Sequence, residues 1–264
     1  MTQDKPMCLI ALAWRADARY PLVVAANRDE FHARRTAPAG FWPEAPSVLA
    51  GRDLKEGGSW MGVTTSGRFA AVTNRRAADG VKAGAPSRGA LVAEFLRGSA
   101  TPAAYLVALA PRAAEYSGFN LLALADGELG YFGNAPELSP RSLGPGLYAL
   151  SNGTLDSDWP KMRRVRARLA ELLAAGLPEA TLVAELFVML ADREPAQEDW
   201  LPDTGVGPEW EKLLSAPFVC SPAYGTRSST VALVDGSGHG LFHERRFTPA
   251  GRPEGDSVQA FAWA

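Results

Sequence analysis

Residues 7–31, MCLIALAW-RADARYP-LVVAA-NRDEF, decide how this chain begins to fold. Residues 8–14 and 22–26 are apolar runs of strand length, and the segment between them is polar and contains a proline. The two runs are therefore predicted to pair as a β-hairpin. The polar stretch at 27–31 is then expected at or just beyond the end of the second strand.

The same two patterns, apolar strand pairs and helical periodicity, continue along the rest of the chain. Further strand signals lie at 59–64, 68–74, 119–126, 129–134, 146–152, 229–236 and 240–247. Helical patterns begin near Ser87, at Thr101-Pro102, at Trp159 and at Pro178. Three stretches rich in proline, glycine or polar residues are predicted as loops: 36–47, 75–89 and 192–216, the last one mobile.

Strand pairs alternate here with pairs of helices, and not strand by helix as in a βαβ protein. Antiparallel sheets covered by helices are the natural packing of such elements, so an α+β layered fold is predicted, with residues 1–264 as one domain. There is no glycine-rich nucleotide-binding motif and no Gly-x-Ser-x-Gly elbow.

Composition excludes several classes of protein. The chain of 264 residues has 27 basic and 29 acidic residues, and this net charge of −2 argues against binding to nucleic acid. Two cysteines and three histidines favour neither a disulfide framework nor a metal site. The apolar runs are too short for a transmembrane segment, and residues 1–6 lack the pattern of a secretory signal. A cytoplasmic location is therefore expected.

The most informative single residue is Cys8, which directly follows Met7. If Met7 were the initiator and were removed, Cys8 would carry a free α-amine beside its thiol. An α-amine of pKa near 8 can act as the base for that thiol, because much of it is neutral at physiological pH. Residues 1–7 are accordingly expected to be a removed or misassigned leader. The alternative is a structural cysteine buried in a strand.

Polar clusters follow four of the predicted strands, at 27–31, 72–74, 150–160 and 221–230. Side chains at the ends of strands can converge on one mouth of a sheet, where asparagine amides can donate to an oxyanion and arginine can hold a carboxylate. The alternative for each cluster is ordinary turn chemistry.

Several of these stretches together resemble the NRDE family, which is that of the transport and Golgi organisation protein 2. The similar stretches are Met7-Cys8-Leu9-Ile10, Asn27-Arg28-Asp29-Glu30, the string from Leu150 to Asp156 with Trp159-Pro160-Lys161, and Tyr224-Gly225-Thr226-Arg227. The family looks like a branch of the N-terminal nucleophile hydrolases. The resemblance therefore implies a four-layer αββα sandwich, most similar to that of the cysteine acylases that act on penicillin V and bile salts.

This resemblance also implies a set of catalytic residues. Cys8 matches the nucleophile of the acylases, and Arg28 with either Asp29 or Glu30 would set the state of its thiol and amine. Asn74 and Asn152 match the oxyanion and amine partners, and Arg227 matches a late arginine. The implied activity is hydrolysis of an amide or thioester of a small or lipid-like acyl compound, with no cofactor and no metal. The pocket itself is expected to be lined by generic apolar side chains.

Two other roles stay open. The family has been linked to haem trafficking and to lipid or acyl-CoA metabolism, so the cleft could carry such a ligand without cleaving it. His32 and Cys8 are then the candidate axial ligands of a haem. In the second alternative, the motif residues are purely structural.

Overall fold

The computed structural model describes residues 8–76 and 82–263, so the predicted leader at 1–7 and part of the predicted loop at 75–89 lie outside the described residues. The strands are β1 (Cys8–Trp14), β2 (Leu22–Phe31), β3 (Thr36–Trp42), β4 (Ala45–Asp53), β5 (Met61–Thr64), β6 (Phe69–Asn74), β7 (Phe119–Ala125), β8 (Glu128–Gly133), β9 (Arg141–Leu143), β10 (Gly146–Leu150), β11 (Tyr224–Val234), β12 (His239–Phe247) and β13 (Pro253–Ala262). The helices are α1 (Arg88–Arg97), α2 (Pro102–Leu109), η1 (Ala110–Glu115), α3 (Pro160–Ala174), α4 (Glu179–Leu190), η2 (Glu198–Trp200) and α5 (Pro208–Leu213).

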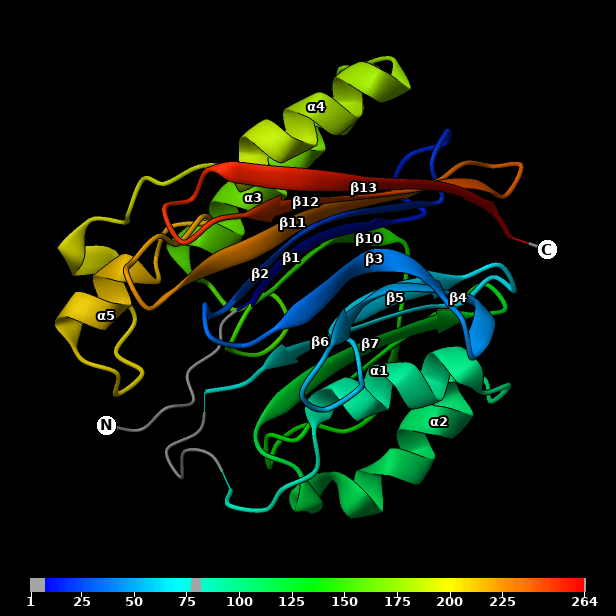
Figure 1. Ribbon diagram of the computed structural model, residues 1–264, viewed down its shortest axis with the longest axis horizontal. Helices are drawn as coiled ribbons and strands as arrows, with labels where there is room; N and C mark the ends of the chain where they lie inside the picture. The colour runs from blue at the N-terminus through cyan, green and yellow to red at the C-terminus, as the bar shows by residue number, and fades with distance from the viewer. Residues whose placement is uncertain (1–7, 77–81, 264) are drawn as a thin grey trace.

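The strands form two antiparallel sheets. One has the order β10-β1-β2-β11-β12-β13, and the other has the order β3-β4-β5-β6-β7-β8-β9. In Figure 1, α3 and α4 lie on one side of the pair of sheets and α1 and α2 lie on the other side. The predicted α+β class with antiparallel sheets is confirmed, and strand predominates over helix.

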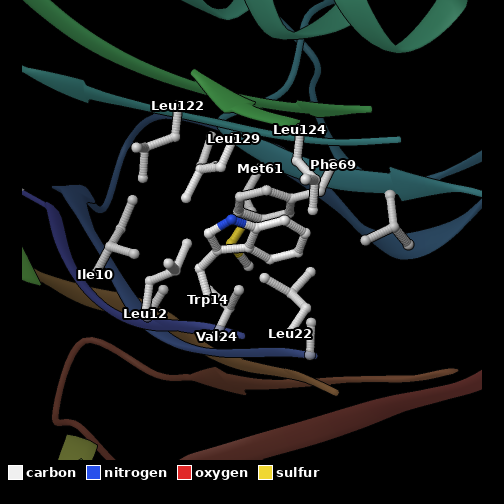
Figure 2. Close-up of a cluster of buried hydrophobic side chains, with 14 of the residues drawn as sticks. Ile10, Leu12, Trp14, Leu22, Val24, Met61, Phe69, Leu122, Leu124 and Leu129 are labelled. Carbon is white, nitrogen blue, oxygen red and sulfur yellow. The ribbon is translucent and has the colours of Figure 1, made fainter. Parts of the chain in front are cut away.

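Strand β1 is buried on both faces, which explains its uninterrupted apolar sequence. Ile10, Leu12 and Trp14 point toward the second sheet and belong to the core between the sheets. Figure 2 shows them meeting side chains such as Phe69 and Leu122 from that second sheet. The alternate residues of β1 belong to a separate core beneath α3 and α4. The first hairpin is therefore the central element of its sheet.

Helix α3 follows the predicted pattern and packs its apolar face on this sheet. Its buried residues include Met162, Val165 and Leu169, and these join the core that β1 and α4 also line. Pro160 occupies the first turn, where its missing N–H costs no hydrogen bond. Lys161, in the same turn, is buried as well. None of the helices in the described part of the chain is long and apolar enough to cross a membrane.

Two of the predicted loops contain regular structure. Residues 36–47 were expected to be irregular, but they form β3 and the start of β4. Trp42 is buried there and donates its indole N–H to the Ala50 carbonyl oxygen at 3.2 Å. The segment 192–216, predicted to be a mobile loop, contains the short helices η2 and α5, and the Glu211 carboxylate joins it to Arg76 and Thr204 through partly buried contacts.

Strand β2 continues through the polar residues 27–31 instead of ending before them. The extension is possible because Asn27 is fully satisfied inside the protein. Its amide nitrogen donates to the carbonyl oxygens of Leu190 at 2.8 Å and Pro217 at 2.9 Å, and its oxygen accepts from Ser229 Oγ at 2.6 Å. Asn27 therefore ties β2 to α4 and β11.

Replacing Ser229 with alanine is expected to lower the free energy of unfolding by about 1–3 kcal/mol, because it leaves the buried Asn27 oxygen without its donor. Urea denaturation measures the change. The exposed Ser99, changed to alanine, is the matched control and should stay within about 0.5 kcal/mol of wild type. A Ser229→Ala variant as stable as the control would contradict this role.

Candidate active site

Cys8 lies at the start of β1 and lines a cavity of about 350 Å³. The thiol is free, 6% exposed, and directly opposite Arg28 on β2. Residues of β2, β3, β4, β6, β11, β12 and β13 and the first turn of α1 complete the wall. The cavity therefore joins both sheets around one cysteine.

The wall of this cavity is polar, contrary to the expected apolar lining. More charged than apolar side chains line it, among them Arg28, Asp29, Glu30, Arg34 and Asp53. Apart from Arg34, which lies between β2 and β3, these groups come from β2 and β4, whose apolar residues belong to the cores.

The environment of Cys8 keeps its thiol protonated. Burial, and next the negative charge of Asp29, raise the pKa of Cys8 to about 12. The positive charge of Arg28 and a hydrogen bond from the Asp29 backbone N–H act in the opposite direction but do not compensate. Nucleophilic attack by this sulfur therefore needs a base.

Asp29 is a buried carboxyl group with one satisfied oxygen. Its Oδ1 accepts from Thr226 Oγ1 at 2.6 Å, whereas its buried Oδ2 has no hydrogen-bond partner in the described structure. Burial raises the pKa of Asp29 to about 7, opposed mainly by the positive charge of Lys161. Asp29 is thus poised to exchange a proton near neutral pH.

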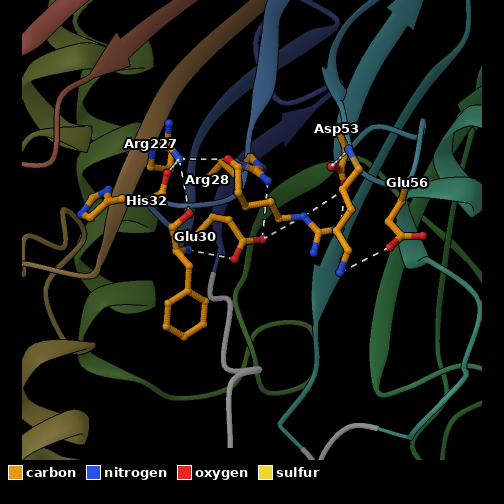
Figure 3. A network of polar contacts seen from close by, with 9 residues as sticks. Arg28, Glu30, His32, Asp53, Glu56 and Arg227 are labelled. Atoms are coloured by element: carbon orange, nitrogen blue, oxygen red, sulfur yellow. Dashed lines mark hydrogen bonds and ion pairs between the residues drawn. The ribbon is translucent and has the colours of Figure 1, made fainter.

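Glu30, the other acidic candidate, has a different environment. Its carboxylate lies 3.5 Å from Arg28 Nη2 and 3.7 Å from Arg34 Nε, and Arg34 also pairs with Asp53 (Figure 3). Glu30 is therefore held by two arginines. Of the two candidates, Asp29 has the larger electrostatic effect on Cys8.

Arg227 lines the cavity, but its guanidinium supports the backbone. Nη1 donates to the carbonyl oxygens of Phe31 at 3.3 Å, His32 at 3.1 Å and Arg34 at 3.1 Å. It therefore holds the connection between β2 and β3, as Figure 3 shows beside Arg28.

The two predicted asparagines lie next to each other but differ in access to the cavity. Asn74, the last residue of β6, lines it, whereas Asn152 does not. The Asn152 side chain donates to the Asn74 carbonyl oxygen at 2.7 Å. Ser151 Oγ lies 2.9 Å from the Cys8 carbonyl oxygen and 3.0 Å from Asn152 Oδ1. Asn152 is therefore placed to fix the backbone around Asn74 and Cys8.

His32, the candidate ligand of a haem, does not line the cavity. Its Nε2 lies 3.0 Å from the Ser221 carbonyl oxygen, and its Nδ1 is buried. Within the described residues, no group of three or more His, Cys, Asp and Glu side chains could hold a metal ion.

One residue near Cys8 was missed by sequence reasoning, although it belongs to a quoted motif. Lys161 is only 2% exposed, and its charge and those of Asp29 and Cys8 influence one another. Lysine is rarely buried so completely without a partner. One sequence signal could have identified it. A lysine in the first turn of an amphipathic helix is unusual, because a cation is disfavoured at the positive end of the helix dipole.

The comparisons with known proteins agree with the motifs. The model of the Transport and Golgi organisation 2 family matches residues 7–249. A Transport and Golgi organization protein 2 homolog from Bos taurus is 40% identical over 243 residues, which are 86% of each chain. The Homo sapiens homolog is 37% identical over 239 residues, again 86% of each chain.

Among solved structures, an N-acylethanolamine-hydrolyzing acid amidase ortholog of Caenorhabditis elegans has a TM-score of 0.44 at 11% identity, covering 85% of this chain and 92% of its own. A mutant conjugated bile acid hydrolase from Clostridium perfringens has a TM-score of 0.49 at 8% identity, covering 97% and 92%. The family match covers most of the sequence and includes Cys8, the NRDE stretch and Lys161. This chain belongs to the Transport and Golgi organisation 2 family.

Proposed function

We propose that this protein is a cysteine-nucleophile hydrolase with the αββα sandwich of the N-terminal nucleophile type. Its substrate would be an amide or thioester of a small or lipid-like acyl compound. The observation that carries the proposal is the position of Cys8 in a cavity, opposite Arg28 and beside the buried carboxyl group of Asp29.

In the proposed reaction, the base is the α-amine that Cys8 gains when the residues before it are removed. The amine takes the thiol proton, and the thiolate attacks the acyl carbon to form a thioester. The acyl–nitrogen or acyl–sulfur bond breaks, and the ammonium returns its proton to the leaving group. Water then hydrolyses the thioester and regenerates the thiol.

The other residues would support these steps. Asn74, which lines the cavity, would donate to the oxyanion, and Asn152 would hold the Asn74 backbone through their 2.7 Å hydrogen bond. Arg28 would favour the thiolate, because its charge already lowers the pKa of Cys8. Arg227 would position the β2–β3 connection from which the cavity wall begins.

The polar wall suits a substrate in which a charged or strongly polar group accompanies the acyl chain. Arg28, Arg34 and Asp53 present ionised groups to the same cavity as Cys8. A purely hydrocarbon ligand would remove water from these charged groups without offering them a polar partner of its own, at a cost in binding free energy.

The test compares the full chain with a chain that begins at Cys8. Both are mixed with p-nitrophenyl esters of increasing acyl length and with a cysteine-directed β-lactone. For the chain beginning at Cys8, we expect a burst of p-nitrophenol and a mass increase equal to the acyl group on the Cys8 peptide. Absence of acylation in both forms, with every donor, would contradict the proposed function.

A carrier of haem or acyl-CoA stays a prediction as the alternative function. Of its two candidate haem ligands, Cys8 lines the cavity and His32 does not. The position of His32, held against Ser221, therefore gives a haem no second ligand at the cavity.

A further inference from the structure

Four cavity-lining residues of the first sheet form one row across four neighbouring strands. Cys8 on β1 lies opposite Arg28 on β2. Arg28 lies in turn opposite Ser228 on β11, which lies opposite Arg246 on β12. All four residues line the cavity. Adjacent strands are about 4.8 Å apart, so the row extends from the candidate nucleophile to a second arginine whose backbone lies about 14 Å away.

The side chains of this row project from the same face of the sheet. Side chains at alternate positions of a strand share a face. Residues an even number of positions along each of the four strands belong to the core between the two sheets: Ile10, Ala26, Ala232 and Phe242. Cys8 and the two arginines therefore project into the space between the sheets, which is where the cavity lies.

Arg28 is a buried cation with an incomplete set of partners. It is 8% exposed, and its Nη2 lies 3.5 Å from Glu30 Oε2. This distance is longer than the roughly 2.7–2.9 Å of a charge-assisted hydrogen bond. Glu30 is also shared with Arg34, whose Nε lies 3.7 Å from the same oxygen. A guanidinium has five N–H donors, so Arg28 can still bind an acceptor inside the cavity.

Arg246, at the other end of the row, is held in place at one nitrogen. Its Nη1 donates to Ser257 Oγ at 2.8 Å and lies 3.8 Å from Glu244 Oε1, which is beyond hydrogen-bond distance. Gly255 lies opposite Arg246 on β13, and a Cβ there would be 2.6 Å from Nη2. Glycine at this position therefore provides the space that the guanidinium occupies.

Ser228 separates the two arginines with a small side chain. Its hydroxyl donates to the buried carboxyl group of Glu244, which also accepts from the Ala39 backbone N–H at 2.9 Å. The backbones of Arg28 and Arg246 are two strand spacings apart, about 10 Å. Two long side chains across this distance, with only a serine between them, can contact one bound group from both sides.

The charge of the cavity favours an anion as that group. Eight lysines and arginines line the cavity against six aspartates and glutamates. Burial raises the pKa of Asp29 to about 7 and also raises that of Glu244, so the negative charge near neutral pH is smaller than this number of carboxyl groups. Burial, and next the positive charge of Arg28, lower the pKa of Arg227. A bound anion would relieve this repulsion between cations.

We infer that the row from Cys8 to Arg246 is a substrate subsite, in which Arg28 and Arg246 hold an acidic group of the compound whose acyl carbon lies at Cys8. The acidic group is a carboxylate or a phosphate, because both accept hydrogen bonds from the fork of a guanidinium. The inference rests on the proposed function and deepens it, since it gives the sign and the place of the polar group on the substrate.

The experiment measures binding without chemistry, in the full chain carrying Cys8→Ala. The reference ligand is N-hexyl octanamide, which is uncharged. Two acidic forms carry a carboxylate at the end of the acyl chain (octanedioic acid monohexylamide) or at the end of the amine chain (N-octanoyl-6-aminohexanoate). A third form carries a phosphate at the end of the amine chain. Isothermal titration calorimetry gives each Kd, and the comparison shows which half of the substrate bears the acidic group and which acid is preferred.

At least one acidic ligand should bind about 10-fold more tightly than N-hexyl octanamide, because charge-assisted hydrogen bonds replace a contact with hydrocarbon. This preference should decrease as the salt concentration rises. With Arg246→Met added, it should fall to about 2-fold or less. Arg246→Lys should keep part of the preference, since lysine retains the charge but not the fork.

Arg245 provides the matched control. It is the preceding residue of β12, it pairs with Asp256 at 2.9 Å, and it does not line the cavity. Arg245→Met removes the same charge from the same strand and should keep the preference for the acidic ligand. An equal loss in Arg245→Met would mean that the effect is only one of net charge, and the inference would be wrong. Equal affinity for all four ligands, or binding of none of them, would also overturn it.

Thermal unfolding checks that Arg246→Met is folded. If it does not fold, Arg246→Lys and the salt series decide: a preference that neither changes contradicts the subsite. The outcomes also separate this inference from the proposed function. If Cys8 is acylated but acidic and uncharged ligands bind equally, the hydrolase stands and the subsite fails. If the preference depends on Arg246 but no donor acylates Cys8, the subsite stands and the hydrolase fails.

Discussion

Replacing Cys8 with alanine in the chain that begins at this residue is expected to reduce acyl transfer at least about 1,000-fold, because the only cavity-lining sulfur in the described structure forms the covalent bond. The free energy of unfolding should change by only about 1 kcal/mol, since the substitution removes one sulfur at the first position of a strand. Release of p-nitrophenol measures the first quantity, and urea denaturation measures the second.

The second free cysteine is a natural control for this experiment. Cys220 is exposed and does not line the cavity, so Cys220→Ala should keep full activity and full acyl labelling. If Cys8→Ala retains acyl transfer, or if the label is found on Cys220, then Cys8 is not the nucleophile.

Replacing Glu211 with alanine is expected to lower the free energy of unfolding by about 3 kcal/mol, because it leaves the largely buried Arg76 guanidinium, 13% exposed, without its carboxylate partner. The other carboxylate oxygen of Glu211 accepts from the Thr204 backbone N–H at 2.7 Å and from the Thr204 hydroxyl. This carboxylate therefore joins α5, the preceding segment and the end of β6. Urea denaturation measures the loss.

Two further variants test the reason for this loss. Glu209 is exposed on the same helix, and Glu209→Ala should be close to wild type in stability. Arg76→Met combined with Glu211→Leu removes both charges and should recover most of the loss, since no unpaired ion remains. If Glu211→Ala costs less than about 1 kcal/mol, the pair does not hold this segment.

The Glu211 prediction also bears on the candidate active site. Glu211 raises the pKa of Lys161, and Arg76 lowers it. With the carboxylate gone, the pKa of Lys161 should fall in any Glu211→Ala protein that stays folded. The segment between α4 and β11, which the sequence predicts to be a mobile loop, thus contributes a charge to the site.

The sequence by itself determined the central hairpin, the first turn of α3 and the family. The apolar runs at 8–14 and 22–26 are close in the sequence and bury apolar side chains when they pair, so the β1–β2 hairpin could be predicted from the sequence. The same hairpin sets Cys8 opposite Arg28. Local chemistry also placed Pro160 at the start of α3. These features depend on neighbouring residues, which a sequence displays directly.

The outcome of the NRDE stretch depended on tertiary contacts. Local composition suggested a strand end, yet β2 runs through it, because partners on β11 and α4 satisfy its polar groups. Successive side chains of a strand point to opposite faces of the sheet. The Asn27 side chain therefore points toward the helices, where it is hydrogen-bonded, whereas the Arg28 side chain points into the cavity.

The burial of Lys161 was decided only when α3 packed on the first sheet. Its environment is made by Asp29, Cys8, Arg76 and Glu211, which are far apart in the chain. The pKa of a buried group depends on how far water is excluded and on which charges lie nearby, and both are properties of the packed structure. The sequence therefore identified Cys8 as the candidate nucleophile. Only the tertiary structure showed that the Lys161 amine, with its lowered pKa, is close enough to Cys8 for their charges to interact.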